Sequence, residues 1–390
     1  MKLDRRDFLG LSVAGGAAAL AGPLAGPLAR NAWAAREKEL NILCWEGYNS
    51  DEVLDPFRRL TGAKVSAESG TSDPDMINKL RAGEVNVWDV INLNQPWARE
   101  QMWPEKLIKP LNKARFEPFF ADMMAPFDKD YKWSYSDGGE LIGIVQRFGP
   151  FNFVVNTDKV SRATAEDEGF DLFNEASNSK KYGILTYDNW NIYHMCVGSG
   201  IDPFKKHDQA EIDAFERTAR AWFKGAKLLS DDLTQMNLAL INGEIDFYLT
   251  GGTYTASPAR LDGATNIRGI TPRRGPMGAP GGGPGDGKGG IVWVEVTSVV
   301  NNPQVSPLAE DFLEYVQGPE ASHAVAFAEG TYNPVTQMGN PKVFELFEKE
   351  ELDAIQWDSL EEELANSVDY QINPDYEVMD KIYNAAKREA

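Results

Sequence analysis

The 390-residue sequence has few of the residues that metal and disulfide chemistry require. It contains two cysteines, Cys44 and Cys196, and three histidines, His194, His207 and His323. Two cysteines are too few for a disulfide framework or for a cysteine-rich zinc or iron–sulfur site, and no pair of histidines has the spacing of metal ligands on a helix. We therefore expect no metal and no cofactor. Whether the two cysteines pair stays open.

Basic residues are also scarce. The chain has 39 Lys and Arg against 59 Asp and Glu, which gives a formal net charge of −20 at pH 7. A negative field of this size repels nucleic acid and favours cationic solutes. We expect no nucleic-acid partner and a small positively charged one.

Beyond the N-terminus, the sequence has no apolar run of the roughly 18 to 20 residues that a membrane span needs. At the N-terminus, Arg5 and Arg6 precede a segment rich in Gly, Ala and Leu, and residues 32–34 (Ala-Trp-Ala) have the form of a signal-peptidase site. Segment 1–34 thus resembles a twin-arginine export signal. A membrane-anchoring helix is the alternative, which the glycines and two prolines disfavour. We expect a periplasmic protein.

One hydrophobic stretch contains a carboxylate. Residues 289–300 read Gly-Gly-Ile-Val-Trp-Val-Glu-Val-Thr-Ser-Val-Val and predict a strand in which Trp293 and Glu295 share a face. An unpaired charge in such a strand is costly. A cationic ligand held by Glu295 and faced by Trp293 would offset that cost. A nearby Lys or Arg would do the same, and the residues leave both readings open.

Apolar runs alternate with helical patterns along most of the chain. The first part has expected strands at 39–45, 64–68 and 88–93, with helices at 53–60 and from Ser72 between them. This order predicts a mostly parallel sheet with helices on both faces. Ligands of such sheets bind beyond the carboxyl ends of the strands, where 45–48 (Trp-Glu-Gly-Tyr) and Asn94 fall.

The middle of the chain predicts a second α/β unit. Two extended runs, 141–146 and 151–156, separated by a break at 147–150, suit a passage between two domains. The expected elements are strands at 182–187 and 245–249, helices from Asn189 and over 209–229, 308–316 and 319–328, a turn at 251–254, a Gly/Pro-rich loop at 275–290, and an acidic helical tail from 341.

No motif for catalysis is present. Gly282 to Lys288 matches Gly-x4-Gly-Lys, but Gly289 follows where a phosphate-binding loop needs Ser or Thr, and a strand follows instead of a helix. The Gly-x-Ser-x-Gly elbow of hydrolases is missing as well. We expect no enzyme activity. A cofactor-dependent periplasmic enzyme stays a third hypothesis, because many twin-arginine substrates carry redox cofactors.

Several segments resemble the bacterial spermidine/putrescine-binding proteins of ABC importers. They are 40–48 (Leu-Asn-Ile-Leu-Cys-Trp-Glu-Gly-Tyr), Phe57-x-x-x-Thr61-Gly62-x-Lys64-Val65, 88–90 (Trp-Asp-Val), Gly289-Gly290-Ile291-x-Trp293-x-Glu295 and Gly330-x-x-Asn333-Pro334. The resemblance implies an α/β fold of the two-lobed periplasmic binding protein type (type II-like), with a ligand cleft between lobes that close about a hinge. It assigns 36–150 and 293–335 to lobe 1, and 151–292 and 336–390 to lobe 2.

The resemblance also implies a set of ligand-binding residues: Trp45, Glu46, Tyr48, Asp188, Tyr254, Trp293 and Glu295. Glu295 takes the place of the principal ammonium-binding carboxylate, and Asp188 that of a second one. The family has a glutamate between the two first-lobe aromatic residues, where this chain has Gly47, and the adjacent Glu46 would substitute for it. A further carboxylate of the family, after the position of Asp188, is replaced by Asn191. Tyr254 replaces an aromatic residue that falls on Gly251. As alternatives, the tryptophans are core residues and Asp188 caps a helix.

These residues predict a periplasmic solute-binding protein that delivers a polyamine or related cationic amine to an ABC permease and works as a monomer. The alternative keeps the fold and changes the ligand to an opine, an aminophosphonate or another zwitterionic amino compound. Arg147, Arg273 or Arg274 beside Glu295 would favour a ligand with an anionic group.

Overall fold

The structure is a computed structural model, and it describes residues 36–390 except 71, 279–284, 286 and 329. The expected export signal at 1–34 lies outside the described residues. Within the described part of the chain, no helix combines the length and the apolar character that crossing a membrane requires.

The first part of the chain alternates strands and helices in the predicted order. The elements are β1 (Glu39–Cys44), α2 (Asp51–Thr61), β2 (Lys64–Ser69), α3 (Asp73–Arg81) and β3 (Val90–Asn94). β1 lies between β2 and β3 and pairs with both in parallel. α2 ends where Gly62 adopts a left-handed conformation with φ of 65°, which a residue without a side chain does at little cost. α3 begins after Ser72, whose side chain accepts a hydrogen bond from the Asp75 amide.

A second set of parallel strands lies in the other half of the molecule. Its elements are β5 (Tyr182–Leu185), α8 (Asp188–Gly198), α9 (Gln209–Gly225), β6 (Leu228–Ser230), α10 (Leu233–Ile241), β7 (Phe247–Gly252), α11 (Thr253–Leu261) and β8 (Ile267–Ile270). β5 pairs in parallel with β6 and β7. The turn expected at 251–254 is wrong, because Gly252 ends β7 and Thr253 begins α11. The helix expected to reach 229 ends at Gly225, since β6 follows.

Two long strands, β4 (Ile144–Asn156) and β9 (Gly290–Val299), join the halves. β4 pairs antiparallel with β9 along its first part and with β7 and β8 along its second. β9 also pairs antiparallel with β3 and parallel with β12 (Ser367–Asp369). The sheet order is β2-β1-β3-β9-β4-β7-β5-β6. The predicted parallel pairing therefore holds within each half, whereas the pairs that join the halves are antiparallel.

The break expected at 147–150 is wrong, because β4 runs through it with a β-bulge. Val145 lies opposite Val296 and Phe148 lies opposite Val294. Two residues of β4, Gln146 and Arg147, therefore share one position opposite Glu295. A bulge of this kind redirects a side chain, and here Arg147 is turned onto Glu295.

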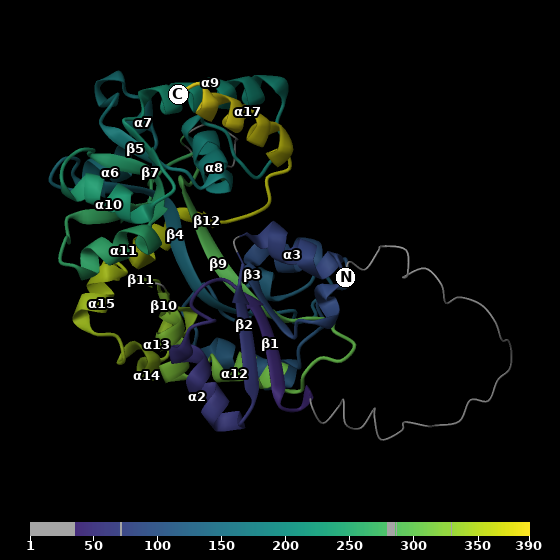
Figure 1. Ribbon diagram of the computed structural model, residues 1–390. Helices are drawn as coiled ribbons and strands as arrows, with labels where there is room; N and C mark the ends of the chain where they lie inside the picture. The colour runs from purple at the N-terminus through teal and green to yellow at the C-terminus, as the bar shows by residue number, and fades with distance from the viewer. Residues whose placement is uncertain (1–35, 71, 279–284, 286, 329) are drawn as a thin grey trace, which may run out of the picture.

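Two large hydrophobic cores lie on either side of these strands. One contains side chains of β1, α2, α3 and β3 with those of α12 (Leu308–Tyr315); the other contains side chains of β5, α8 and α9 with those of α17 (Tyr376–Arg388). Figure 1 shows the yellow α17 against the teal α9, far along the chain from one another, and β4 and β9 running between the halves. Cys44 belongs to the first core and Cys196 to the second, and both are free.

The remaining helices and short strands follow β9: α13 (Pro319–Ala326), β10 (Phe327–Ala328), β11 (Thr331–Tyr332), α14 (Pro341–Phe344), α15 (Lys349–Ala354) and α16 (Leu360–Ala365). The helices expected at 308–316 and 319–328 and the helical tail are thus present. β12, which adds a strand beside β9, is a feature that the sequence did not indicate.

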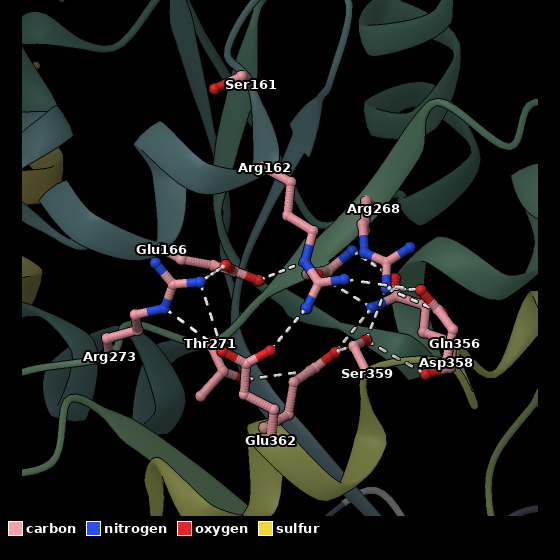
Figure 2. Close-up of polar contacts among 12 residues, drawn as sticks. Ser161, Arg162, Glu166, Arg268, Thr271, Arg273, Gln356, Asp358, Ser359 and Glu362 are labelled. Atoms are coloured by element: carbon pink, nitrogen blue, oxygen red, sulfur yellow. Dashed lines mark hydrogen bonds and ion pairs between the residues drawn. The ribbon is translucent and has the colours of Figure 1, made fainter.

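A group of ion pairs, here named the three-arginine network, attaches the C-terminal segment to the second half. Its cations, Arg162, Arg268 and Arg273, contact the carboxylates of Glu166, Asp167, Asp358 and Glu362. Figure 2 shows the three guanidinium groups side by side above α16. Arg273 lies in this network and Arg274 is exposed, so neither lies beside Glu295.

Candidate ligand cleft

A cavity of about 840 Å³ lies between the two halves. From the first half it is bordered by residues at the carboxyl ends of β1, β2 and β3, and from the second by the segment after β5 and by α8, α11 and α17. This is the position that ligands take in open α/β sheets, and the volume is that of a small-molecule site. The main lining side chains are Trp45, Glu46, Asn94, Trp97, Phe151, Tyr187, Trp190, Tyr193, Tyr254, Trp293, Glu295, Tyr370 and Tyr376.

Aromatic rings form most of the wall on the side of the second half. Trp190 packs edge to face on Phe151, with ring centroids 5.0 Å apart, and lies 5.0 Å from Tyr370. Tyr193 lies 5.3 Å from Tyr370. Across the cavity, the Trp97 indole donates a hydrogen bond of 3.2 Å to the Tyr370 hydroxyl. The wall offers ring faces, which attract both methylene groups and cations.

Five of the seven predicted site residues line this cavity: Trp45, Glu46, Tyr254, Trp293 and Glu295. Tyr48 does not, since it is fully buried behind the cavity, where its ring lies 5.3 Å from the Arg147 guanidinium carbon. That aromatic face is already occupied by a cation. The side chain of Asp188 lies outside what the structure describes, and its backbone opens α8.

Glu295 is held by an internal arginine. Arg147 donates from Nε to Oε2 at 3.0 Å and from Nη2 to Oε1 at 2.7 Å, and both side chains are buried. This parallel two-bond geometry is the strongest that a guanidinium and a carboxylate form. Of the two readings that the sequence left open, an internal arginine is the one found, since Arg147 supplies the cation that Glu295 requires.

Each partner of this pair favours the charged form of the other. Burial raises the pKa of Glu295, and the Arg147 charge and hydrogen bonds oppose that rise. Burial also acts to lower the pKa of Arg147, but the adjacent Glu295 outweighs it, so this pKa is raised above its ordinary value. Since Arg147 does not line the cavity, the pair presents the carboxylate and not the guanidinium to a ligand.

Glu46 is a second carboxylate of the cavity, and its surroundings differ. It is half-buried, and the Tyr254 hydroxyl donates to its Oε1 at 3.2 Å. Among the described residues no Lys, Arg or His forms an ion pair with it. Burial and the charge of Glu46 raise the pKa of Tyr254, which keeps the phenol protonated as the donor. This contact also bridges the two halves, because Glu46 follows β1 and Tyr254 belongs to α11.

Asn191, which stands where the resembled family has a carboxylate, has a structural role. It is fully buried, donates to the Leu185 carbonyl at 3.0 Å and accepts from the Tyr383 hydroxyl at 2.7 Å. It also donates to the Thr250 hydroxyl. Asn191 therefore ties α8 to β7 and α17 and cannot reach a ligand.

His194 completes this scaffold behind the aromatic wall. Its Nε2 lies 2.8 Å from the Phe151 carbonyl, which only accepts, so the proton is on Nε2 and Nδ1 accepts from Thr250 at 2.9 Å. Burial lowers the pKa of His194 to about 3, so the ring is neutral. The histidine positions the backbone of Phe151 and has no contact with the cavity.

Several cavity residues were missed by sequence reasoning, chiefly Trp97, Trp190, Tyr193 and Tyr370. Trp190 and Tyr193 lie three residues apart on α8, and that spacing after a strand end was a usable signal. No sequence pattern indicated Trp97 or Tyr370, because these residues are 273 positions apart and the fold brings them together. Among the described residues, no group of three or more His, Cys, Asp and Glu side chains is arranged to hold a metal ion.

Comparison with protein-family models and with curated protein sequences found no match. Solved structures did match. The spermidine/putrescine ABC transporter substrate-binding protein PotD of Streptococcus pneumoniae is 16% identical, with a TM-score of 0.64 over 90% of this chain and 99% of that one. A candidate spermidine/putrescine ABC transporter protein of Listeria monocytogenes is 15% identical, with a TM-score of 0.67 over 90% and 100%. The PBP MotA of A. tumefaciens, solved with glucopine, is 13% identical, with a TM-score of 0.58 over 90% and 99%.

At this level of identity the likeness shows the fold. The chain has the two-lobed α/β fold of the substrate-binding proteins of ABC transporters, which confirms the predicted fold class. The spermidine/putrescine-binding proteins, to which the sequence motifs pointed, are among the structures that share it.

Proposed function

We propose that this chain is the solute-binding component of an ABC importer and that its ligand is a small cationic amine. The observation that supports this most directly is Glu46, a carboxylate in an aromatic cavity with no cationic partner among the described residues. An ammonium group would bind there favourably, because it can donate charge-assisted hydrogen bonds to the carboxylate and contact the faces of the aromatic rings. In this proposal Glu46 binds the ammonium, and Glu295 contributes negative potential from within its pair.

The proposal includes a mechanism of capture. Lobe 1 consists of 36–150 and 293–335, lobe 2 of 151–292 and 336–390, and they close over the ligand by bending β4 and β9. The Glu46–Tyr254 contact joins the lobes at the cavity. The closed form is the one that a permease would recognise. Export through the twin-arginine pathway would place the protein, as a monomer, in the periplasm.

A second candidate ligand class is the zwitterionic amino compounds. Arg147 is beside Glu295, and its Nη1 has no hydrogen-bond partner among the described residues. Nη1 points at the backbone of Gly47, where an added Cβ would lie 2.7 Å from it. A ligand carboxylate in the cavity would not reach this donor, because Nη1 is buried and Arg147 does not line the cavity. This arrangement favours the plain amine.

Paired ligands distinguish the two classes. Calorimetric titration with putrescine and with ornithine compares the same diamine without and with a carboxylate, and agmatine and arginine form a second pair. The proposed function predicts that putrescine or agmatine binds more tightly than its carboxylated partner. The opposite order in both pairs would move the assignment to zwitterions, and no binding of any amine would overturn the proposal.

The variant Glu46→Gln tests the site itself. It keeps the shape of the side chain and removes the charge, so we expect the amine affinity to fall by roughly 10- to 100-fold, as for a hydrogen bond to a charged group. Unchanged affinity would remove Glu46 from the site. An absorption spectrum of the purified protein addresses the enzyme hypothesis, because a bound redox cofactor would colour it.

A further inference from the structure

One buried carboxylate connects the ends of three parallel strands beneath the cavity. Asp73 is 4% exposed and is the first residue of α3, which follows β2. Its Oδ1 accepts from the Trp45 indole at 2.9 Å and from the Asn94 amide N–H at 3.0 Å, and its Oδ2 accepts from the Asn94 side chain at 2.8 Å. Trp45 follows β1 and Asn94 ends β3, and both line the cavity.

We propose that Asp73 is a positioning residue of this cavity, which holds the Trp45 indole and the Asn94 amide in place for a bound cation and releases the amide when it is protonated. The inference rests on the proposed function, because it concerns the same cavity. It adds a residue that does not touch the solute and that makes capture depend on pH.

The hydrogen-bond chemistry explains the release. An ionised carboxylate only accepts, and all three contacts of Asp73 use that property. Oδ1 receives two donors, which leaves Oδ2 as the position for a proton. A hydroxyl at Oδ2 would face the donor side of the Asn94 amide, so the amide must turn to offer its oxygen. Protonation of Asp73 therefore turns the side-chain amide of Asn94, a residue that lines the cavity.

The surroundings of Asp73 place this event in an accessible pH range. Burial raises the pKa of Asp73 to about 6, although the hydrogen bonds from Asn94 and Trp45 oppose the rise. Among the described residues, Glu295 on β9 and Tyr370 after β12 interact electrostatically with Asp73 from other elements, and neither is cationic. A cation in the cavity would favour the ionised form, so its affinity should fall as the pH drops below about 6.

The first experiment needs no ligand. In 15N-labelled protein, the indole N–H resonance of Trp45, assigned with Trp45→Phe, reports on its acceptor. We expect it to titrate with a midpoint near pH 6 in the native protein and to stay constant in Asp73→Asn. The matched control Asp75→Asn removes the same charge from the exposed side of α3 and should leave the titration unchanged. A Trp45 resonance that does not move between pH 5 and 8 overturns the inference, whether or not Asp73→Asn folds.

The second experiment connects Asp73 to the solute. With putrescine as the probe, we expect affinity to fall about fivefold between pH 7.5 and 5, as for one unit of linked pKa, and Asp73→Asn to lose this dependence. An equal pH dependence in Asp73→Asn and Asp75→Asn would overturn the link to binding. Failure of putrescine to bind at any pH counts against the proposed function instead, and the indole titration then decides the role of Asp73 alone.

Discussion

The three-arginine network and the Arg147–Glu295 pair both bring arginines to carboxylates, but they differ in exposure and in the number of partners. Arg273 is 38% exposed and contacts three carboxylates, those of Glu166, Asp167 and Glu362. The side chains of Arg147 and Glu295 are 2% and 4% exposed, and they contact one another. In the network, water and alternative partners compensate for the loss of any one contact.

This difference in burial predicts how strongly the loss of an ion pair destabilises the protein in each place. The network fastens α16 at the surface, where single pairs contribute little and salt weakens them. The buried pair lies where β4 and β9 cross between the lobes, so an uncompensated charge there acts on both. Arg147 contacts both carboxylate oxygens of Glu295, which leaves Glu46 as the cavity glutamate without an ion-pair partner among the described residues.

Replacing Arg147 by Met should have the largest effect. It leaves the Glu295 charge buried without a partner, for which we expect a loss of about 3 to 5 kcal/mol in the free energy of unfolding, measured in urea at pH 7. The control Arg147→Met/Glu295→Gln should recover part of that loss, because the charge is then gone. If the unfolding free energy of Arg147→Met lies within about 1 kcal/mol of the native value, the buried pair is no more important for stability than an exposed one.

Glu295→Gln should destabilise the protein somewhat less, by about 3 kcal/mol, because it leaves the Arg147 charge buried without its partner, although the amide still accepts one hydrogen bond from Arg147. Its effect on amine binding should be smaller than that of Glu46→Gln, since Glu46 is the proposed contact. Titration of both variants with putrescine and agmatine measures the order. If Glu295→Gln weakens binding more than Glu46→Gln, Glu295 contacts the ligand after all.

The buried Asp73 predicts a pH dependence of stability. Its pKa is raised in the folded protein from 3.8 to about 6, so the folded state binds the proton more tightly than the unfolded state does. Stability from this group is present at low pH and is lost as the pH rises through 6. Lowering the pH from 7 to 5 should therefore stabilise the native protein by about 1 kcal/mol relative to Asp73→Asn, as determined by urea unfolding. If the unfolding free energies of the native protein and of Asp73→Asn change equally with pH, Asp73 does not contribute this pH dependence.

Arg273→Met should have the smallest effect, about 0.2 to 1 kcal/mol, because its partners are partly exposed and keep other contacts. Thermal unfolding in low salt and in about 1 M NaCl checks this, since the difference from the native protein should disappear at high salt. A salt-independent loss as large as that of Arg147→Met would mean that the two groups of charges are equivalent.

The sequence predicted the local elements well. The alternation of strands and helices in each half, the strand at 290–299 and the common face of Trp293 and Glu295 follow from side-chain periodicity, which acts over a few residues. The family-like segments also led to the two-lobed fold. The errors lie where distant segments meet: β12, the start of α11, and the continuous β4, whose partners are far along the chain.

The sequence by itself determined that a carboxylate and an indole share a buried strand and that the strand needs a cation. Only the tertiary structure decided which cation. Arg147 lies 148 residues before Glu295, and a bulge in β4, set by pairing with β9, turns it inward. Local preference cannot encode that register. The same long-range packing placed Tyr48 behind the cavity and Asp73 beneath it, and so determined which acidic groups are left for a solute.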